Sequence, residues 1–249
     1  MSPRLQFAMD IALEAGNSTL AYFQSDLEVS FKADDSPVTL ADRNAESILR
    51  KRISQRFPED GIYGEEEGQS GDQTRRWVLD PIDGTKSFIC GVPLFATLVA
   101  FEDDSHRQIG VAFFPALDLM VSAEIGGGAR CNGELIHVSR KAEISTSVIC
   151  TGSVSTFRKR SKLDGYLKLS DEALASRTWC DAYGHCLVAM GRVEAMIDPR
   201  VEPYDIAAVQ VIVTEAGGKV TTFDGGNDPQ TDAISSNGLL HDLILERMS

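Results

Sequence analysis

The sequence lacks the features of several common protein classes. No apolar run is long enough to cross a lipid bilayer, so no membrane-spanning segment is expected. Basic residues are few, since 24 Lys and Arg stand against 37 Asp and Glu and give a formal net charge of −13. A nucleic-acid-binding surface needs a basic face, so nucleic acid is not expected as a partner. The first residues carry Asp10 and Glu14 within their apolar pattern, which is not typical of a signal peptide.

Cysteine and histidine are also sparse. The five cysteines are scattered and include no CxxC pair, a pattern typical of reduced thiols in a cytoplasmic protein. The four histidines lie far apart, and none has the spacing of zinc ligands. With 43% apolar and 24% charged residues, the composition indicates an ordinary globular protein, expected in the cytoplasm.

The first part of the chain has a helical pattern. Apolar residues at helical spacing predict one helix over residues 3–24 and a second over 39–57. Thr39 is expected to cap the second helix, with Asp42 three residues further on. A loop over 29–37 is predicted between the two helices.

The pattern then changes twice. Residues 58–73 are rich in glycine and acids and predict a mobile loop. Short strands with short connections over 77–139 favour an antiparallel sheet, whereas the later residues alternate strands and helices, with a turn at 179–184. We therefore expect two parts, residues 1–140 and 141–249, that form one compact unit.

The segment WVLDPIDGT places two acids at the end of an apolar strand. Pro81–Ile82 fixes the backbone so that Asp80 and Asp83 can converge on one face. Gly84 and Thr85 then supply backbone N–H groups at a helix start, where a phosphate can bind. Two neighbouring carboxylates repel each other, so the segment is either an acidic surface turn or a site with a cation between the two acids. Hard divalent cations such as Mg²⁺ prefer oxygen ligands of this kind.

Three further acids stand at similar positions. Asp42 and Asp205 lie in the first turns of predicted helices, and Glu65 follows a glycine. Taken singly, Asp42 and Asp205 are equally compatible with acids that interact with the helix dipole. Glu65 is equally compatible with a solvated loop charge. The residues alone leave both interpretations open.

Three motifs together resemble the inositol monophosphatase-like, Mg²⁺-dependent phosphatases, which include relatives of fructose-1,6-bisphosphatase. The motifs are GEE at Gly64–Glu66, WVLDPIDGT at Trp77–Thr85, and PYDIAA…EAGG at Pro203–Gly218. Their order and separations match from the second helix to the end of the chain. The resemblance implies an α+β to α/β fold of the layered αβαβα sandwich type, a small-molecule phosphate ester as substrate, and a homodimer.

The resemblance also implies a set of Mg²⁺ ligands. Glu65, Asp80 and the carbonyl of Ile82 would hold one ion, and Asp80, Asp83 and Asp205 would hold a second. A third, weaker ion near Glu65 would bring the number to two or three per site. One ion would lower the pKa of the attacking water, and another would stabilise the leaving oxygen in an in-line displacement.

The remaining implied roles concern water and phosphate. Thr85 and Asp42 would form a hydrogen-bonded pair that orients the attacking water and helps to deprotonate it, with Glu65 as a further catalytic residue. The backbone amides of Gly84 and Thr85, together with Asp83, would contact the phosphate.

Other segments resemble one branch of the family, the histidinol-phosphate phosphatases. These segments are Lys86–Phe88, Tyr204–Asp205 and Cys180–Gly184. The resemblance puts Asp181 in the substrate pocket, with Asp198 as a second pocket carboxylate. Histidinol phosphate carries an ammonium group and an imidazole, and carboxylates would pair with both. Asp181 is also compatible with a helix N-cap, and Asp198 with a turn acid before a proline.

The expected activity is Mg²⁺-dependent hydrolysis of L-histidinol phosphate to L-histidinol and phosphate, in histidine biosynthesis. An inositol-1-monophosphatase stays open as an alternative, as does a phosphatase of broad specificity or one that cleaves 3′-phosphonucleotides. A regulatory binding protein on the same scaffold is a third hypothesis.

Overall fold

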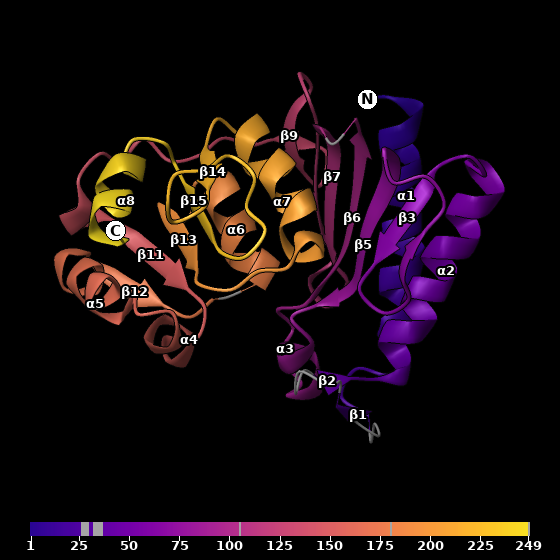
Figure 1. Ribbon diagram of the computed structural model, residues 1–249, viewed down its shortest axis with the longest axis horizontal. Coiled ribbons are helices and arrows are strands. Elements are labelled where there is room, and N and C mark those ends of the chain that lie inside the picture. The colour runs from indigo at the N-terminus through magenta and orange to yellow at the C-terminus, as the bar shows by residue number, and fades with distance from the viewer. Residues whose placement is uncertain (26–29, 32–36, 105, 180, 249) are drawn as a thin grey trace.

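A computed structural model describes residues 1–25, 30–31, 37–104, 106–179 and 181–248. Helices and sheets alternate in five layers (Figure 1). Two helices cover an eight-stranded sheet, two more separate it from a five-stranded sheet, and three cover the far face of the second sheet. The predicted αβαβα sandwich is therefore confirmed.

The helices form three layers. The outer layer on the first sheet consists of α1 (Pro3–Thr19) and α2 (Leu40–Arg56), and the central layer of α6 (Asp181–Ala189) and α7 (Pro203–Glu215). The opposite outer layer consists of α4 (Val154–Lys159), α5 (Leu163–Glu172) and α8 (His241–Met248). The expected capping box of the second helix is present, because the Thr39 side chain accepts from the helix backbone and Asp42 accepts from Thr39.

The larger sheet is almost wholly antiparallel. Its strands, in spatial order, are β10 (Glu134–Leu135), β9 (Gly128–Cys131), β8 (Leu119–Glu124), β7 (His106–Phe114), β6 (Ala96–Asp103), β5 (Arg75–Asp83), β3 (Gly61–Gly64) and β4 (Gly68–Ser70). The β3–β5 pair is the parallel exception. The short helix α3 (Thr85–Ile89) follows β5 directly.

The smaller sheet is mixed. Its order is β12 (Ala175–Arg177), β11 (Val148–Thr151), β13 (Ala195–Asp198), β15 (Ala233–Ser236) and β14 (Lys219–Thr221). β11 pairs in parallel with β12 and β13, whereas β15 is antiparallel to both of its neighbours. Short elements complete the described chain: β1 (Ser30–Phe31), β2 (Pro37–Val38), and two 3₁₀ turns at Pro115–Leu117 and Ile144–Thr146.

A buried apolar layer lies on each face of each sheet. The largest apolar cluster fills the space between the two sheets, where α6 and α7 lie. The backbone of β7 contacts α7 directly at Gly110, because a Cβ atom there would lie 2.0 Å from the carbonyl oxygen of Ala208. No larger residue fits between these two backbones, so this contact fixes the distance from the first sheet to α7.

Several details of the predicted elements were wrong. The segment over 58–73, expected to be a mobile loop, contains the strands β3 and β4, because its glycines allow close packing that a composition rule does not foresee. The expected turn at 179–184 is in part the first turn of α6, and α1 ends at Thr19 rather than near residue 24. The division at residue 141 stays a prediction.

The other expectations concern limited parts of the chain. The predicted loop over 29–37 falls mainly outside the described residues, as does Cys180. The four cysteines within the described ranges form no disulfide. Among the described residues, no helix combines the length and the apolar character that crossing a bilayer requires.

Candidate functional site

A β-bulge in β5 brings Asp80 and Asp83 to the same side of the sheet. In a regular strand, residues three positions apart point to opposite faces. Here the pairing of β5 with β6 shifts register between these two residues, at Pro81–Ile82. Pro81 has no N–H for the ladder, and its carbonyl accepts a hydrogen bond of 2.8 Å from the Thr97 hydroxyl. The extra residue therefore redirects the Asp83 side chain toward Asp80.

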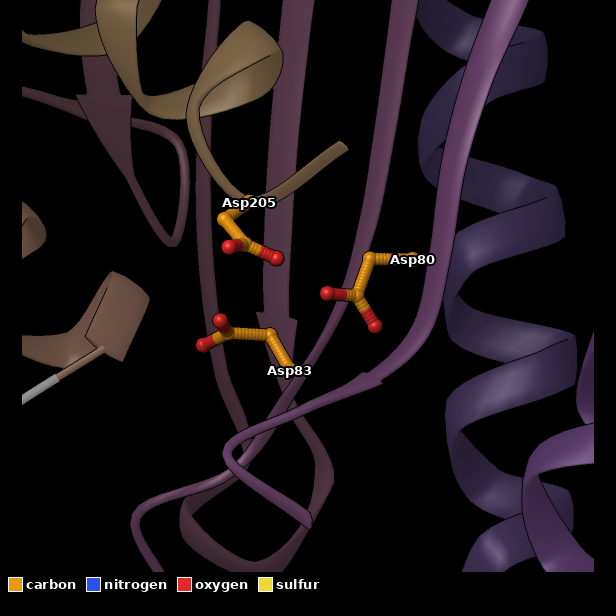
Figure 2. A group of neighbouring side chains, drawn as sticks. All are labelled: Asp80, Asp83 and Asp205. Atoms are coloured by element: carbon orange, nitrogen blue, oxygen red, sulfur yellow. The ribbon is translucent and has the colours of Figure 1, made fainter. Parts of the chain in front are cut away.

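Asp205 completes a cluster of three carboxylates. It lies in the first turn of α7, and one oxygen atom from each of Asp80, Asp83 and Asp205 lies within 4.8 Å of the others. Figure 2 shows the three side chains pointing toward one another from β5 and α7. The structure thus brings Asp205 to two acids that lie more than 100 residues earlier in the sequence, and the three could hold a metal ion.

The cluster lies in a cleft of about 200 Å³. The lining residues are Glu65, Asp80, Ile82, Asp83, Gly84, Thr85, Lys86, Asp181, Arg200, Glu202, Tyr204 and Asp205. Six of them are acidic and two are basic. The cleft therefore attracts cations, and an anionic substrate needs them for binding.

The acids of the cluster are difficult to ionise without a cation. Burial raises the pKa of Asp80 well above its ordinary value, and the neighbouring Glu65, Asp83 and Asp205 raise it further. Burial likewise raises the pKa of Asp83 and of Asp205. One oxygen of Asp80 is buried and has no hydrogen-bond partner. A buried carboxylate oxygen without a partner is costly, and a bound cation would remove that cost.

Two of the clustered acids also cap helices. Asp83 Oδ2 accepts a hydrogen bond of 2.8 Å from the backbone N–H of Ala182, at the start of α6. Asp205 Oδ2 accepts one of 2.7 Å from the N–H of Glu202, at the start of α7. Asp205 is therefore both a helix cap and a member of the carboxylate cluster, so the two interpretations of Asp205 from the sequence are compatible.

The expected hydrogen bond between Thr85 and Asp42 is not formed in this structure. The Thr85 hydroxyl donates to the carbonyl oxygen of Ile82 at 3.1 Å. Asp42 Oδ2 accepts from the N–H and the hydroxyl of Thr39, whereas its Oδ1 is buried without a partner. Burial raises the pKa of Asp42, with a smaller contribution from Glu65. Asp42 does not line the cleft itself.

The two expected pocket acids lie close to each other but differ in exposure to the cleft. Asp181 lines it at the start of α6. Asp198 ends β13, and its Oδ1 accepts from the N–H of Arg200 at 3.2 Å, as expected of a turn acid. Burial raises the pKa of Asp198 to about 7, and the charge of Asp181 contributes to the rise. The two carboxylates are thus near enough to interact.

The prediction of the site missed some cleft residues. Glu202 was not predicted to line it, and Lys86 and Tyr204 were expected only as features of the family branch. The sequence EPYD carries a usable signal for Glu202. An acid three residues before the site aspartate, followed by proline, is typical of a helix start that would face the same cleft.

The fold and the site together define a class of protein, a layered α/β sandwich with a candidate divalent-metal centre in an acidic cleft between its sheets. Comparison with known proteins specifies the class further. The sequence pattern of the inositol monophosphatase family matches residues 1–248, and the chain belongs to this family.

Known relatives of this chain include enzymes and solved structures. The chain is 47% identical over 228 residues to a histidinol-phosphatase of Chlorobaculum parvum, and the match covers 90% of this chain and 88% of the relative. A histidinol-phosphatase of Mycobacterium tuberculosis is 38% identical over 253 residues, with 98% and 97% covered. The solved structure of the IMPase of Thermotoga maritima matches with a TM-score of 0.91 and 33% identity, over 99% of this chain and 97% of that one.

Proposed function

We propose that this protein is a Mg²⁺-dependent phosphomonoesterase that hydrolyses L-histidinol phosphate to L-histidinol and phosphate. The observation that carries the proposal is the cluster of Asp80, Asp83 and Asp205 in the acidic cleft. The similarity to histidinol-phosphatases over almost the whole chain supports the choice of substrate.

The donor set of the cleft fits Mg²⁺. All three clustered side chains offer carboxylate oxygens, which hard divalent cations prefer to nitrogen or sulfur ligands. We propose that Asp80, Asp83 and Asp205 hold the cation site, with Glu65 and the carbonyl of Ile82 as further ligands, for two or three ions in all. When bound, Mg²⁺ supplies positive charge that offsets the phosphate and lowers the pKa of water.

Other residues of the chain would position the reacting groups. Asp42 Oδ1 is buried without a hydrogen-bond partner, and Thr85 lines the cleft. We propose that both orient the attacking water, together with Glu65. The N–H groups of Gly84 and Thr85 would donate to phosphate oxygens at the start of α3.

The substrate assignment depends on the acids around the cleft. Histidinol phosphate carries an ammonium group and an imidazole that protonates near neutral pH. Asp181 lines the cleft, and its charge contributes to the raised pKa of Asp198. We propose that these two carboxylates bind the cationic end of the substrate. Inositol phosphates carry only hydroxyl groups at the corresponding end and gain less from two acids.

A panel of phosphate esters tests this function. Phosphate release is measured from histidinol phosphate, inositol 1-phosphate, fructose 1,6-bisphosphate and adenosine 3′,5′-bisphosphate, with Mg²⁺ and with EDTA. We expect the highest kcat/KM for histidinol phosphate and no turnover in EDTA. A higher kcat/KM for inositol 1-phosphate would refute the substrate assignment, and turnover in EDTA would refute the metal mechanism.

Three further expectations, on pathway, compartment and oligomeric state, belong to the same proposal. We propose that the enzyme acts in histidine biosynthesis, in the cytoplasm, and as a homodimer. Growth of a histidinol-phosphatase-deficient strain without histidine, after introduction of this chain, tests the first. Light scattering after size-exclusion chromatography tests the third, and a mass near 27.1 kDa would refute it.

A further inference from the structure

A fully buried glutamate lies beneath the turn that carries Glu65. Glu46 belongs to α2, and its side chain has no exposed surface. Its Oε2 accepts a hydrogen bond of 2.7 Å from the N–H of Glu66, and its Oε1 accepts one of 3.0 Å from the N–H of Glu67. The carboxylate therefore binds the backbone of the β3–β4 turn directly.

Arg50 completes this anchor. One helical turn after Glu46, its Nε donates to Glu46 Oε1 at 2.7 Å. Its two terminal nitrogens donate to the carbonyl of Gly68 at 2.6 Å and to the hydroxyl of Ser70 at 3.2 Å. A single guanidinium thus joins the buried carboxylate to β4, the far strand of the hairpin.

The close approach of Glu46 requires a glycine in β3. A Cβ atom on Gly64 would lie 2.2 Å from Glu46 Oε1 and 2.8 Å from a terminal nitrogen of Arg50. Glu65 follows at once, and its N–H donates to the carbonyl of Leu79 at 3.2 Å, one residue before Asp80. The backbone donors of residues 65, 66 and 67 are therefore all bound, two of them by one carboxylate.

We propose that Glu46 is a positioning residue for the metal site, and that it acts by fixing the turn that presents Glu65 to the cleft. The inference rests on the proposed function, in which Glu65 is a metal ligand. A buried ion pair adds little net stability compared with apolar residues, but it fixes one geometry. Residues that orient metal ligands commonly change metal affinity by about 10- to 100-fold when they are replaced.

Calorimetric titration of metal-free protein with MgCl₂ tests the proposal. We compare the wild type with Glu46→Gln, Glu65→Gln and the double variant. Glu46→Gln should weaken Mg²⁺ binding by about tenfold or more. Because Glu46 acts only through Glu65, the double variant should bind no more weakly than Glu65→Gln alone. Additive losses in the double variant would overturn the proposal.

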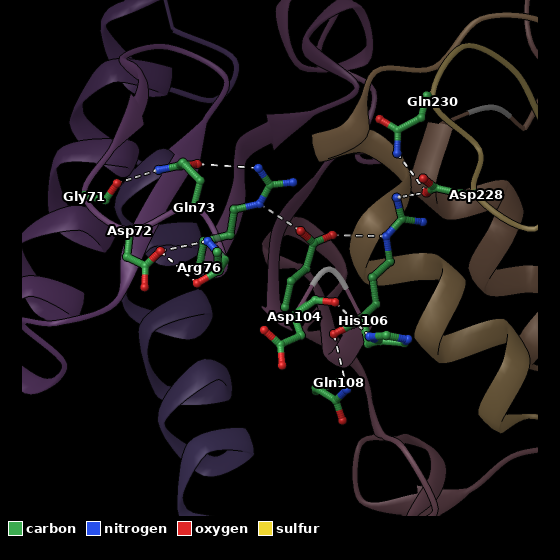
Figure 3. Close-up of polar contacts among 12 residues, drawn as sticks. Gly71, Asp72, Gln73, Arg76, Asp104, His106, Gln108, Asp228 and Gln230 are labelled. Carbon is green, nitrogen blue, oxygen red and sulfur yellow. Dashed lines mark hydrogen bonds and ion pairs between the residues drawn. The ribbon is translucent and has the colours of Figure 1, made fainter.

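A matched control separates positioning from a general loss of stability. Glu102 is also buried and is not among the residues that line the cleft, and it accepts from the Nε atoms of Arg76 at 2.8 Å and Arg107 at 3.3 Å. Figure 3 shows Arg76 and the polar contacts around it. Glu102→Gln should lower the melting temperature without changing Mg²⁺ affinity. If Glu46→Gln folds and binds Mg²⁺ as the wild type does, the positioning role is wrong while the proposed function stands.

Two further outcomes are decisive. If Glu46→Gln fails to fold, Arg50→Lys replaces it, since this variant keeps the Glu46 charge but loses the fork to Gly68 and Ser70. A smaller weakening of Mg²⁺ binding in Arg50→Lys supports the proposal, and unchanged binding overturns it. A wild-type protein that binds no Mg²⁺ would overturn the proposed function, and the positioning role with it.

Discussion

Replacing Asp80 by asparagine should stabilise the metal-free protein and abolish its activity. The Asp80 side chain is 2% exposed, one of its oxygens has no partner, and three other acids surround it. Asparagine has the same shape and no charge, and its amide group can donate to the neighbouring carboxylates. The change therefore removes the source of the repulsion while keeping the packing.

The size of the effect follows from how far burial moves the pKa of Asp80. Burial raises the pKa of folded Asp80 above 3.8, the value of an unperturbed aspartate. Between the two pKa values the folded state holds the proton and the unfolded state does not, so the stability of the wild type falls as pH rises. At pH values above the folded pKa, every pKa unit between the folded and the unfolded state lowers the free energy of unfolding by about 1.4 kcal/mol. In a chain of this length, a loss of about 1.4 kcal/mol lowers the melting temperature by about 3–6 °C.

Thermal unfolding at pH 8 measures the effect, in EDTA and again in excess Mg²⁺. Asp80→Asn should melt above the wild type in EDTA, and the order should reverse in Mg²⁺, because a ligand stabilises only the protein that binds it. Turnover should fall by at least about 100-fold. Asp60→Asn is the matched control, since Asp60 pairs with Arg4 and Arg75 and its loss should destabilise the protein. A lower melting temperature of Asp80→Asn in EDTA would refute the reasoning.

Three further predictions concern substrate choice, pH and packing. Asp181→Asn should lower kcat/KM for histidinol phosphate by about 10- to 100-fold and leave inositol 1-phosphate hydrolysis nearly unchanged; equal losses on both esters would contradict its role. Burial lowers the pKa of His185 to about 3, so below pH 6.5 the unfolded state binds a proton that the folded state excludes. In urea unfolding, the stability advantage of the wild type over His185→Gln should shrink by about 1.6 kcal/mol between pH 6.5 and pH 5, and a constant difference would contradict this. Gly110→Ala should cost about 1–3 kcal/mol in the same assay, because the added methyl group meets the Ala208 carbonyl, and unchanged stability would exclude that contact.

Local patterns predicted much of the fold. The short apolar runs of β6 and β7 and the capping box at Thr39 depend on neighbours within a few positions, so the sequence specifies them directly. The hairpin of β3 and β4 could not be predicted in this way. Its backbone is held in place by hydrogen bonds to Glu46 and Arg50, which lie about 20 residues earlier on another element, and composition alone suggests a loop.

The site shows the same division. Asp80 and Asp83 were predicted to converge because Pro81 lies between them, and the bulge at that point brings them together. The local pattern EPYD indicates that Glu202 stands at a helix start, but the position of this start in the cleft depends on how α7 packs against the first sheet, which is a long-range contact. The absent Thr85–Asp42 bond likewise depends on competition from the Ile82 carbonyl and Thr39, which only the three-dimensional structure shows.

The hydrogen bond from Ala182 to Asp83 has a consequence for how the proposed ligands influence each other. The carboxylate of Asp83 faces the proposed cation site, and the same group caps α6, the helix that begins at Asp181. Any change in the orientation of Asp83 when Mg²⁺ binds must therefore also move the first turn of α6. Linkage is reciprocal, so the factor by which Mg²⁺ changes the affinity for a substrate held by Asp181 equals the factor by which that substrate changes the affinity for Mg²⁺. The binding of metal and the binding of substrate would then be coupled through one carboxylate.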